Sequence, residues 1–327
     1  MMFTALVLAT SMHAQQDHAD RVQAAEAFAA ADKSTAIALD HPARTHWNFF
    51  PGERHGTRLA DMTPAQREAA MRLVRALLSQ QGWDTVTGIM VVEVELRERS
   101  IAAGRGAGNR DPEAYTLAIW GDPTRPHWGS RFEGHHLSVN YTHTPEGSFM
   151  TPLFLGAAPK EITEGPRAGT APLQHIETIA LALRNSLSAE QVAEAVISTD
   201  RPHDVLLQRG KTDLLKTPQG LAAGTLSGPQ RGLLMRLLSA FSGRLAQDMG
   251  KAAQQRLLEG GPSAIRLAWI GGTSTDAPRY WRLHGADWVI EFDSVGDDPH
   301  HVHCIWHDLR HNFGGDVLKR HLQQHDH

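Results

Sequence analysis

The chain has 327 residues, of which 41% are hydrophobic and 21% charged, a composition typical of globular proteins with a sizeable core. Its net charge of −4 and the lack of a long Lys/Arg run exclude the basic footprint of a nucleic-acid-binding protein. No window approaches the about 20 consecutive apolar residues that a membrane span requires, so no membrane span is predicted.

The first residues have features of a secretory signal peptide. An apolar stretch, residues 3–9, is followed by small and polar residues with a cleavage position after Ala14, although no Lys or Arg precedes the apolar core. We expect residues 1–14 to be a signal peptide and the protein to be periplasmic or secreted; the alternative is a frayed cytoplasmic N-terminus. Cys304 is the only cysteine, which excludes an intrachain disulfide and a multi-thiolate zinc site.

In the first half, helices precede strands. Residues 17–32 predict a helix, and a second helix has Thr63 as N-cap, Pro64 in its first turn, Gln66 completing a capping box and Gly82 just past its end. The β-branched residues of 86–96 predict a strand, and further strands are predicted at 115–120, 132–142 and 151–155. A connector containing Pro and Gly follows at 159–172.

The second half has the same order of elements. Helices are predicted at 173–187, 188–197 and 229–249, strands at 265–270, 279–283, 288–292 and 302–306, and a last helix at 315–324. Helices followed by strands in each half predict an α+β fold with a mostly antiparallel sheet, and not alternating βαβ units.

Similar motifs recur in the two halves at an offset of 164 to 165 residues. They are Gly56, Gln66-Arg67, Tyr115 and His135-His136 in the first half, and Gly220, Gln230-Arg231, Tyr280 and His300-His301 in the second. We expect an internal duplication, with 15–165 and 166–327 as related halves packed about a pseudo-twofold axis into one compact unit. The alternative is that a common helix opening and abundant histidines, 20 in all, recur by chance.

The sharpest local motif is His301-Val302-His303. On a strand, residues two apart face the same side at about 6 to 7 Å, so both imidazoles can reach one ion. With His136 as the counterpart of His301, three histidines would form an open metal site, most simply for zinc, with copper or iron as further possibilities. The alternative is that these histidines are solvent-exposed or only hydrogen-bonded.

Three carboxylates are candidates for a fourth ligand or a catalytic base: Glu133, Glu291 and Asp293. Glu291 lies between apolar residues, so it must be paired, bound to metal or protonated. In a hydrolase it would take a proton from metal-bound water. The alternative is a salt bridge to Arg131, Arg279 or Arg282.

Four further residues are expected near the site. His135 has the opposite strand parity to His136 and is expected to hydrogen-bond, whereas His307 shares the parity of His303 further along the strand. Arg54 and Trp281 are expected to help wall a pocket, although tryptophan as core filler is the commoner case. The sequence lacks a Gly-x-Ser-x-Gly elbow, a Walker loop and a His-Glu-x-x-His motif.

Several of these strings resemble the DUF3500 family, a domain of unknown function. The resemblance covers about residues 47–321 and is carried by Glu133-Gly-His-His-Leu-Ser, Tyr280-Trp-Arg-Leu, Ile290-Glu-Phe-Asp and His301-Val-His. It departs from the family at His307, where the family tends to have arginine. Because the family name implies no activity, the functional expectation depends on the residues themselves.

The sequence therefore favours an exported metal-dependent enzyme, most simply a metal-assisted hydrolase that acts on a small molecule, with His136, His301 and His303 as ligands and Glu133 or Glu291 as fourth ligand or base. A copper or iron oxidoreductase would use the same ligand types. Two further hypotheses are a non-catalytic periplasmic protein that binds metal or a small ligand, and a scaffold whose histidines only hydrogen-bond. No oligomeric state is predicted.

Overall fold

The computed structural model describes residues 2–31, 36–107 and 110–315. Within these ranges seven helices are present: α1 (Met2–Ala31), α2 (Pro64–Leu77), α3 (Gln80–Ala102), α4 (Gln174–Asn185), α5 (Ala189–Ala195), α6 (Gly228–Ser242) and α7 (Gln247–Leu257). None of the helices in these ranges combines the length and apolar character of a membrane span.

Twelve strands of the described residues form one sheet: β1 (Ala36–Ile37), β2 (Thr57–Arg58), β3 (Thr116–Gly121), β4 (Trp128–Gly134), β5 (Leu137–Thr144), β6 (Gly147–Phe149), β7 (Leu153–Ala157), β8 (Leu221–Ala222), β9 (Arg266–Gly271), β10 (Arg279–His284), β11 (Trp288–Ser294) and β12 (Val302–Asp308). Their order is β1-β3-β4-β5-β7-β12-β11-β10-β9-β8, with β2 beside β3 and β6 beside β5. Only β1 and β3 pair in parallel, so the expected α+β fold with a mostly antiparallel sheet is confirmed.

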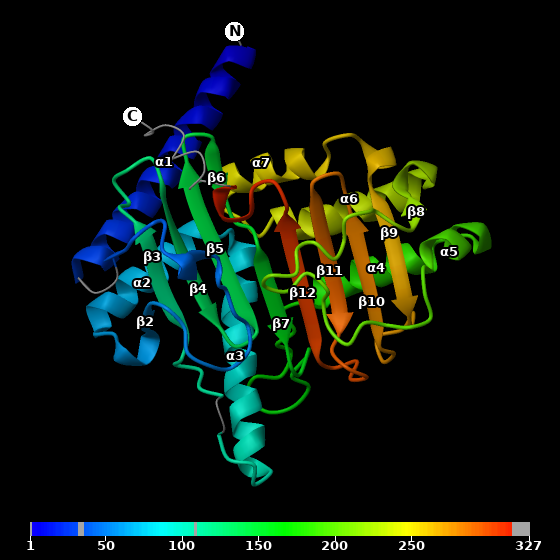
Figure 1. The fold of residues 1–327 in the computed structure, drawn as a ribbon, viewed down its shortest axis with the longest axis horizontal. Coiled ribbons are helices and arrows are strands. Elements are labelled where there is room, and N and C mark those ends of the chain that lie inside the picture. The colour runs from blue at the N-terminus through cyan, green and yellow to red at the C-terminus, as the bar shows by residue number, and fades with distance from the viewer. Residues whose placement is uncertain (1, 32–35, 108–109, 316–327) are drawn as a thin grey trace.

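The helices pack behind the sheet in the view of Figure 1, and irregular chain crosses its front. The alternation of β12 shows the two faces: Val302, Cys304 and Trp306 join the large hydrophobic core on the helix side. Ile305 instead packs with Trp47 on the opposite face. Polar side chains on that second face are thus shielded by loops and not by helices.

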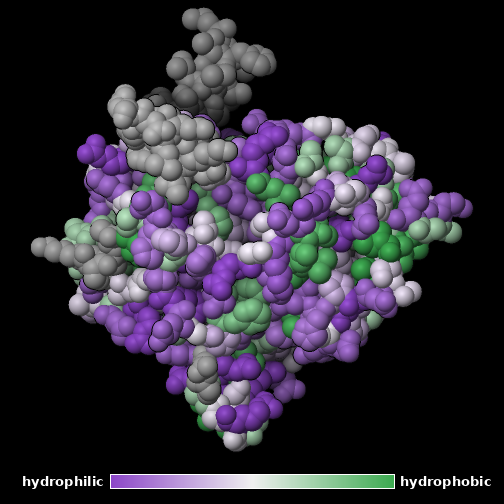
Figure 2. All heavy atoms as spheres, in the orientation of Figure 1, coloured by the Kyte–Doolittle hydropathy of each residue, from purple (hydrophilic) through white to green (hydrophobic). Residues whose placement is uncertain are grey.

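Two irregular segments cover this second face, and we call them the first cover segment (residues 42–56) and the second cover segment (residues 198–220). The Asn48 N–H donates to Glu133 Oε2 at 3.0 Å, which ties the first segment to β4. The N–H groups of Leu206 and Leu207 donate to the two oxygens of Glu291 at 2.9 Å each, which ties the second segment to β11. On this side the surface is mostly hydrophilic, with separate small hydrophobic patches (Figure 2).

The strand predicted at 86–96 is wrong, because these residues lie in α3. Ser79 caps this helix by accepting from the Gly82 N–H at 3.1 Å. Val86, Ile89 and Val92 then recur at helical spacing and are all buried, so packing outweighs their β-branched preference. Gly82 consequently lies inside the second helix of a pair and does not end the first.

The single helix predicted at 229–249 is also wrong, because the chain breaks after Ser242. Gly243 caps α6, Leu245 bridges to Leu78, and α7 begins at Gln247. Glycine is a poor helix former, so Gly243 favours such a break. The helix predicted at 315–324 lies outside the described residues, apart from Gly315.

Candidate metal centre

The first histidine pair forms the turn between β4 and β5. Gly134 pairs with Leu137, which leaves His135 and His136 as the two central residues. His136 has a φ of 62°, a left-handed backbone that Gly or Asn usually supplies in turns. Its N–H donates to Phe49 O at 3.0 Å, and its carbonyl accepts from the Gly156 N–H at 2.7 Å. The turn is thus held between the first cover segment and β7.

His303 reaches the same place from β12. It is the register partner of Gly156, so His136, Gly156 and His303 form a row that runs from the β4–β5 turn through β7 to β12. A Cβ on Gly156 would lie 2.9 Å from His303 Cδ2 and 3.1 Å from His136 Cδ2, closer than normal carbon contacts. Only glycine at this position lets the two imidazoles approach each other without displacement.

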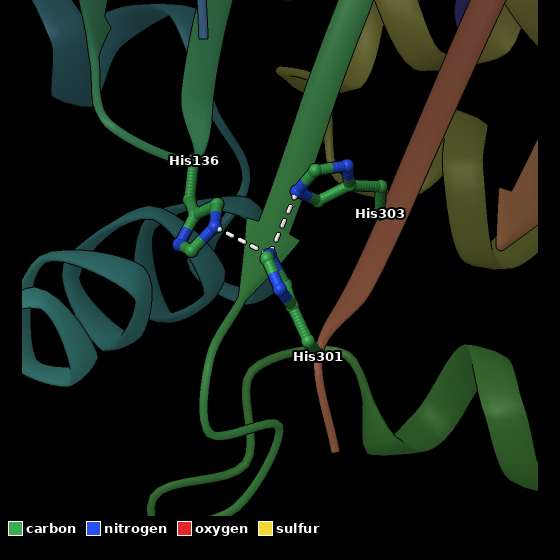
Figure 3. A group of neighbouring side chains, drawn as sticks. All are labelled: His136, His301 and His303. Atoms are coloured by element: carbon green, nitrogen blue, oxygen red, sulfur yellow. Dashed lines mark hydrogen bonds between the residues drawn. The ribbon is translucent and has the colours of Figure 1, made fainter. Parts of the chain in front are cut away.

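His301 completes the group just before β12. Its Nε2 lies 3.0 Å from His136 Nε2 and 3.1 Å from His303 Nε2. One nitrogen of each of the three rings lies within 4.8 Å of the others, and Figure 3 shows the rings pointing toward one another. Ligands bound tetrahedrally at 2.0 to 2.1 Å would lie roughly 3.3 Å apart, which is close to the observed separations.

The surroundings of the three imidazoles are largely buried, and they favour the uncharged form of His136 and His301. His136 and His303 are 3% and 2% exposed, and His301 is partly buried. Burial, followed by the neighbouring histidines, lowers the pKa of His136 well below its ordinary value, and burial together with His303 lowers the pKa of His301 to about 4. Neutral imidazole is the form that binds transition metals.

Asp204, from the second cover segment, supports this arrangement. Its Oδ1 lies 2.7 Å from His303 Nδ1. With the Nδ1–H of His303 donated to this carboxylate, the Nε2 atom carries a lone pair directed at His301. A carboxylate behind a ligating histidine in this manner fixes its tautomer and orientation. No motif in the sequence marks Asp204, because it lies in an irregular segment nearly 100 residues from His303.

Glu93 and His135 form a second polar pair beside His136. Glu93 Oε2 lies 2.7 Å from His135 Nδ1, and the His135 ring stacks on His136 with centroids 3.8 Å apart. Glu93 is 1% exposed, and its Oε1 has no hydrogen-bond partner among the described residues. One ligand atom from each of Glu93, His135 and His136 lies within 4.8 Å of the others. The hydrogen bond expected for His135 is therefore present.

The family model described as "Protein of unknown function (DUF3500)" matches residues 14–315. The chain belongs to the DUF3500 family. Neither a curated protein nor a solved structure matches it. The family resemblance expected from the sequence is confirmed, and the Glu-Gly-His-His-Leu string that suggested it is the turn that carries His136.

In this DUF3500 protein, the carboxylates of Glu133 and Glu291 are directed elsewhere. Glu133 pairs with Arg131 at 3.0 Å in addition to holding Asn48. Glu291 accepts from the Tyr280 hydroxyl at 2.7 Å as well as from the second cover segment. Burial raises the pKa of each carboxyl. Among the described residues, neither belongs to a group with metal-binding geometry.

Asp293 and the tryptophan expected in a pocket are likewise placed away from the three histidines. Asp293 accepts from Arg201 at 2.9 Å, and burial raises its pKa to about 8. The expectation that Trp281 walls a pocket is wrong: it is fully buried in the core on the helix side and stacks on Phe292. The physical reason is strand parity, because Tyr280 and Arg282 on either side of it take the opposite face.

The last two expected residues lie on the loop-covered face. Arg54 belongs to the first cover segment and donates to the carbonyls of Gly52, at 2.7 Å, and Phe50. Burial lowers its pKa. His307 lies in β12 four residues beyond His303 and lines a separate cavity of about 740 Å³. Its Nε2–H donates to Leu207 O at 2.8 Å.

Proposed function

We propose that this DUF3500 protein binds a divalent transition metal ion through Nε2 of His136, His301 and His303. The observation that supports this most is the double contact at His301, whose Nε2 lies 3.0 and 3.1 Å from two other ring nitrogens. A single N–H directed at one neighbour cannot serve both contacts with good geometry. One cation would satisfy all three lone pairs at once.

The ligand set favours an open site over a closed one. Three histidines leave a fourth tetrahedral position for water or substrate, as in catalytic zinc sites, whereas structural zinc sites have four protein ligands. We assign that position to water and not to Glu133 or Glu291, because both carboxylates accept hydrogen bonds that anchor the cover segments. Zinc is the simplest occupant, and copper or iron accepts the same imidazole ligands.

The activity that fits this site best is metal-assisted hydrolysis of a small molecule. A bound zinc ion would supply a nucleophile by lowering the pKa of its water to about 7. The chain contributes the ligand geometry, the Asp204 carboxylate behind His303, and the pair of buried Glu93 and partly buried His135 next to His136. A copper or iron oxidoreductase is the second candidate, and a non-catalytic metal- or ligand-binding protein is the third. We retain export to the periplasm or beyond as part of the proposal.

We also infer that the chain arose by internal duplication. The central strands have the same order from either side, β3-β4-β5-β7 and β9-β10-β11-β12, with β7 beside β12. Gly56 and Gly220 both have positive φ and lie close to the carbonyls of Leu117 and Leu267. In this correspondence between the halves, β7 is equivalent to β12. The sequence motifs instead made His136 equivalent to His301, so the two correspondences differ. The three histidines of the metal centre would then not be related to one another by the pseudo-twofold axis.

Metal analysis of the purified full-length chain tests the proposal. After loading and desalting, we expect about one zinc ion per chain, lost in His301→Ala and in His303→Ala. His300→Ala is the matched control, because His300 is adjacent but exposed. Unchanged metal content in His303→Ala would overturn the proposal. Visible absorption and electron spin resonance of protein from its native compartment would separate copper or iron from zinc.

A further inference from the structure

The cavity that His307 lines lies on the loop-covered face, toward the end of β12 that is far from His303. Its volume is about 740 Å³, within the range of small-molecule pockets. Trp47, Leu215 and Phe313 contribute apolar surface to its wall. An apolar cluster that includes Phe154 and Ile305 lies on the same face as His303 and continues to Trp47. This cavity is therefore distinct from the proposed metal centre.

Two side chains that line the cavity each have one buried polar atom without a hydrogen-bond partner among the described residues. His284 is 2% exposed, and its Nδ1 makes no hydrogen bond among the described residues. Asn312 donates through Nδ2 to His307 Nδ1 at 2.8 Å, but its Oδ1 has no partner in the same part of the chain. A buried polar atom left without a partner destabilises the protein. A ligand with one acceptor and one donor would satisfy both atoms once the two side chains rotate toward the cavity.

The charged residues around the cavity favour an anion. Arg209 and Lys216 line it, both are exposed, and neither has an ion-pair partner among the described residues. Asp213 is the one acidic residue in the described lining. Basic groups in the lining thus outnumber acidic groups, and apolar side chains line the same cavity. This combination suits a molecule with a charged end and an apolar body.

We propose that this cavity binds a small organic carboxylate that has an apolar ring and a hydroxyl group. Arg209, Lys216 and the His284 ring would hold the carboxylate, the apolar wall would contact the ring, and Asn312 Oδ1 would accept from the hydroxyl. No residue of the three-histidine group takes part. The site therefore stands whether or not the protein binds metal.

Isothermal titration calorimetry with 4-hydroxybenzoate as the probe tests this inference on the full-length protein. We expect saturable binding, at least about tenfold weaker in the double variant Arg209→Gln/Lys216→Gln, since the variant loses both charge-assisted contacts to the carboxylate. His284→Phe, which fills the cavity with an apolar ring, should also weaken it. Arg125→Gln is the control, because Arg125 is an exposed arginine on a remote turn.

The comparison ligands separate the parts of the inference. The neutral methyl ester of the probe should bind at least about tenfold more weakly, because it lacks the charge that the two cations recognise. Inorganic phosphate should bind more weakly than the probe, because it lacks a ring. Equal binding of the ester or of phosphate, undiminished binding in the double variant, or no saturable binding at all would each overturn the proposal. Retained binding in His303→Ala is expected, and it keeps this test separate from that of the metal centre.

Discussion

Gly156 and His303 face each other across β7 and β12 so closely that the glycine has no room for a side chain. The same missing side chain admits the His136 ring from the opposite direction. The approach of a histidine in the β4–β5 turn to a histidine in β12 thus depends on a residue that has no chemistry of its own. This relationship yields the most direct test of the geometry.

Gly156→Ala should weaken zinc binding by about tenfold or more, equivalent to about 1.4 kcal/mol, because the new Cβ would push both imidazoles apart. The measurement is competition with a chromophoric chelator. Gly232→Ala is the matched control, since a Cβ there meets nothing within 4 Å. A Gly156→Ala protein with wild-type affinity would show that the rings do not share an ion.

Asp204→Asn should reduce zinc affinity by about 10- to 100-fold, the usual effect of losing a carboxylate behind a ligating histidine. The amide keeps the shape of the side chain but removes the charge that favours the Nδ1–H tautomer of His303. Asp297→Asn serves as the control, because Asp297 is a fully exposed carboxylate nearby. Equal affinity of the two variants would contradict a supporting role for Asp204.

Glu291→Gln should destabilise the fold by about 1 to 3 kcal/mol, because the carboxylate accepts from Tyr280 and from two N–H groups of the second cover segment. Since that segment carries Asp204, zinc affinity should fall as well. Urea unfolding and the same chelator competition measure the two effects. Glu259→Gln, at an exposed position, should change neither. Loss of hydrolysis without any change in stability or metal affinity would instead favour Glu291 as the base.

Metal-free protein should lose stability as the pH falls from 6.5 to about 4, and His307 should contribute to this loss. Burial lowers the pKa of His307 to about 4. Between pH 6.5 and about 4 this residue is therefore protonated in the unfolded chain but stays neutral in the folded chain. Above pH 6.5 the residue is neutral in both states and contributes no pH dependence. The full penalty, reached below about pH 4, amounts to up to about 3 kcal/mol.

His307→Gln removes this titration while keeping a polar side chain. Urea unfolding of wild type and variant across this pH range should give curves that converge toward low pH, because only the wild type pays the protonation penalty. Parallel curves would show that His307 titrates alike in the folded and unfolded chain.

Strand parity and the motifs shared with the family made part of the candidate site predictable from the sequence. The two-residue repeat alone sets both imidazoles of the His-x-His motif on one face, and the sheet brings His136 to the same place. Glu93 escaped prediction because the β-branched residues around it favoured a strand, and only the packing of α3 turns it toward His135. Asp204 escaped because a long loop positions it. Trp281 was misplaced because its pattern does not say which face of a strand is the helix side.

The left-handed backbone at His136 sets the ring through the main chain, which Phe49 and Gly156 clamp on both sides. A preorganised metal site selects ions by their radius and by their preference for nitrogen ligands. Calcium, which takes six to eight oxygens at 2.3 to 2.6 Å, and magnesium, which sheds its hydration shell reluctantly, would both be rejected even where they are abundant. The selectivity of this protein among metal ions would thus be fixed by the conformation of the β4–β5 turn before any cation binds.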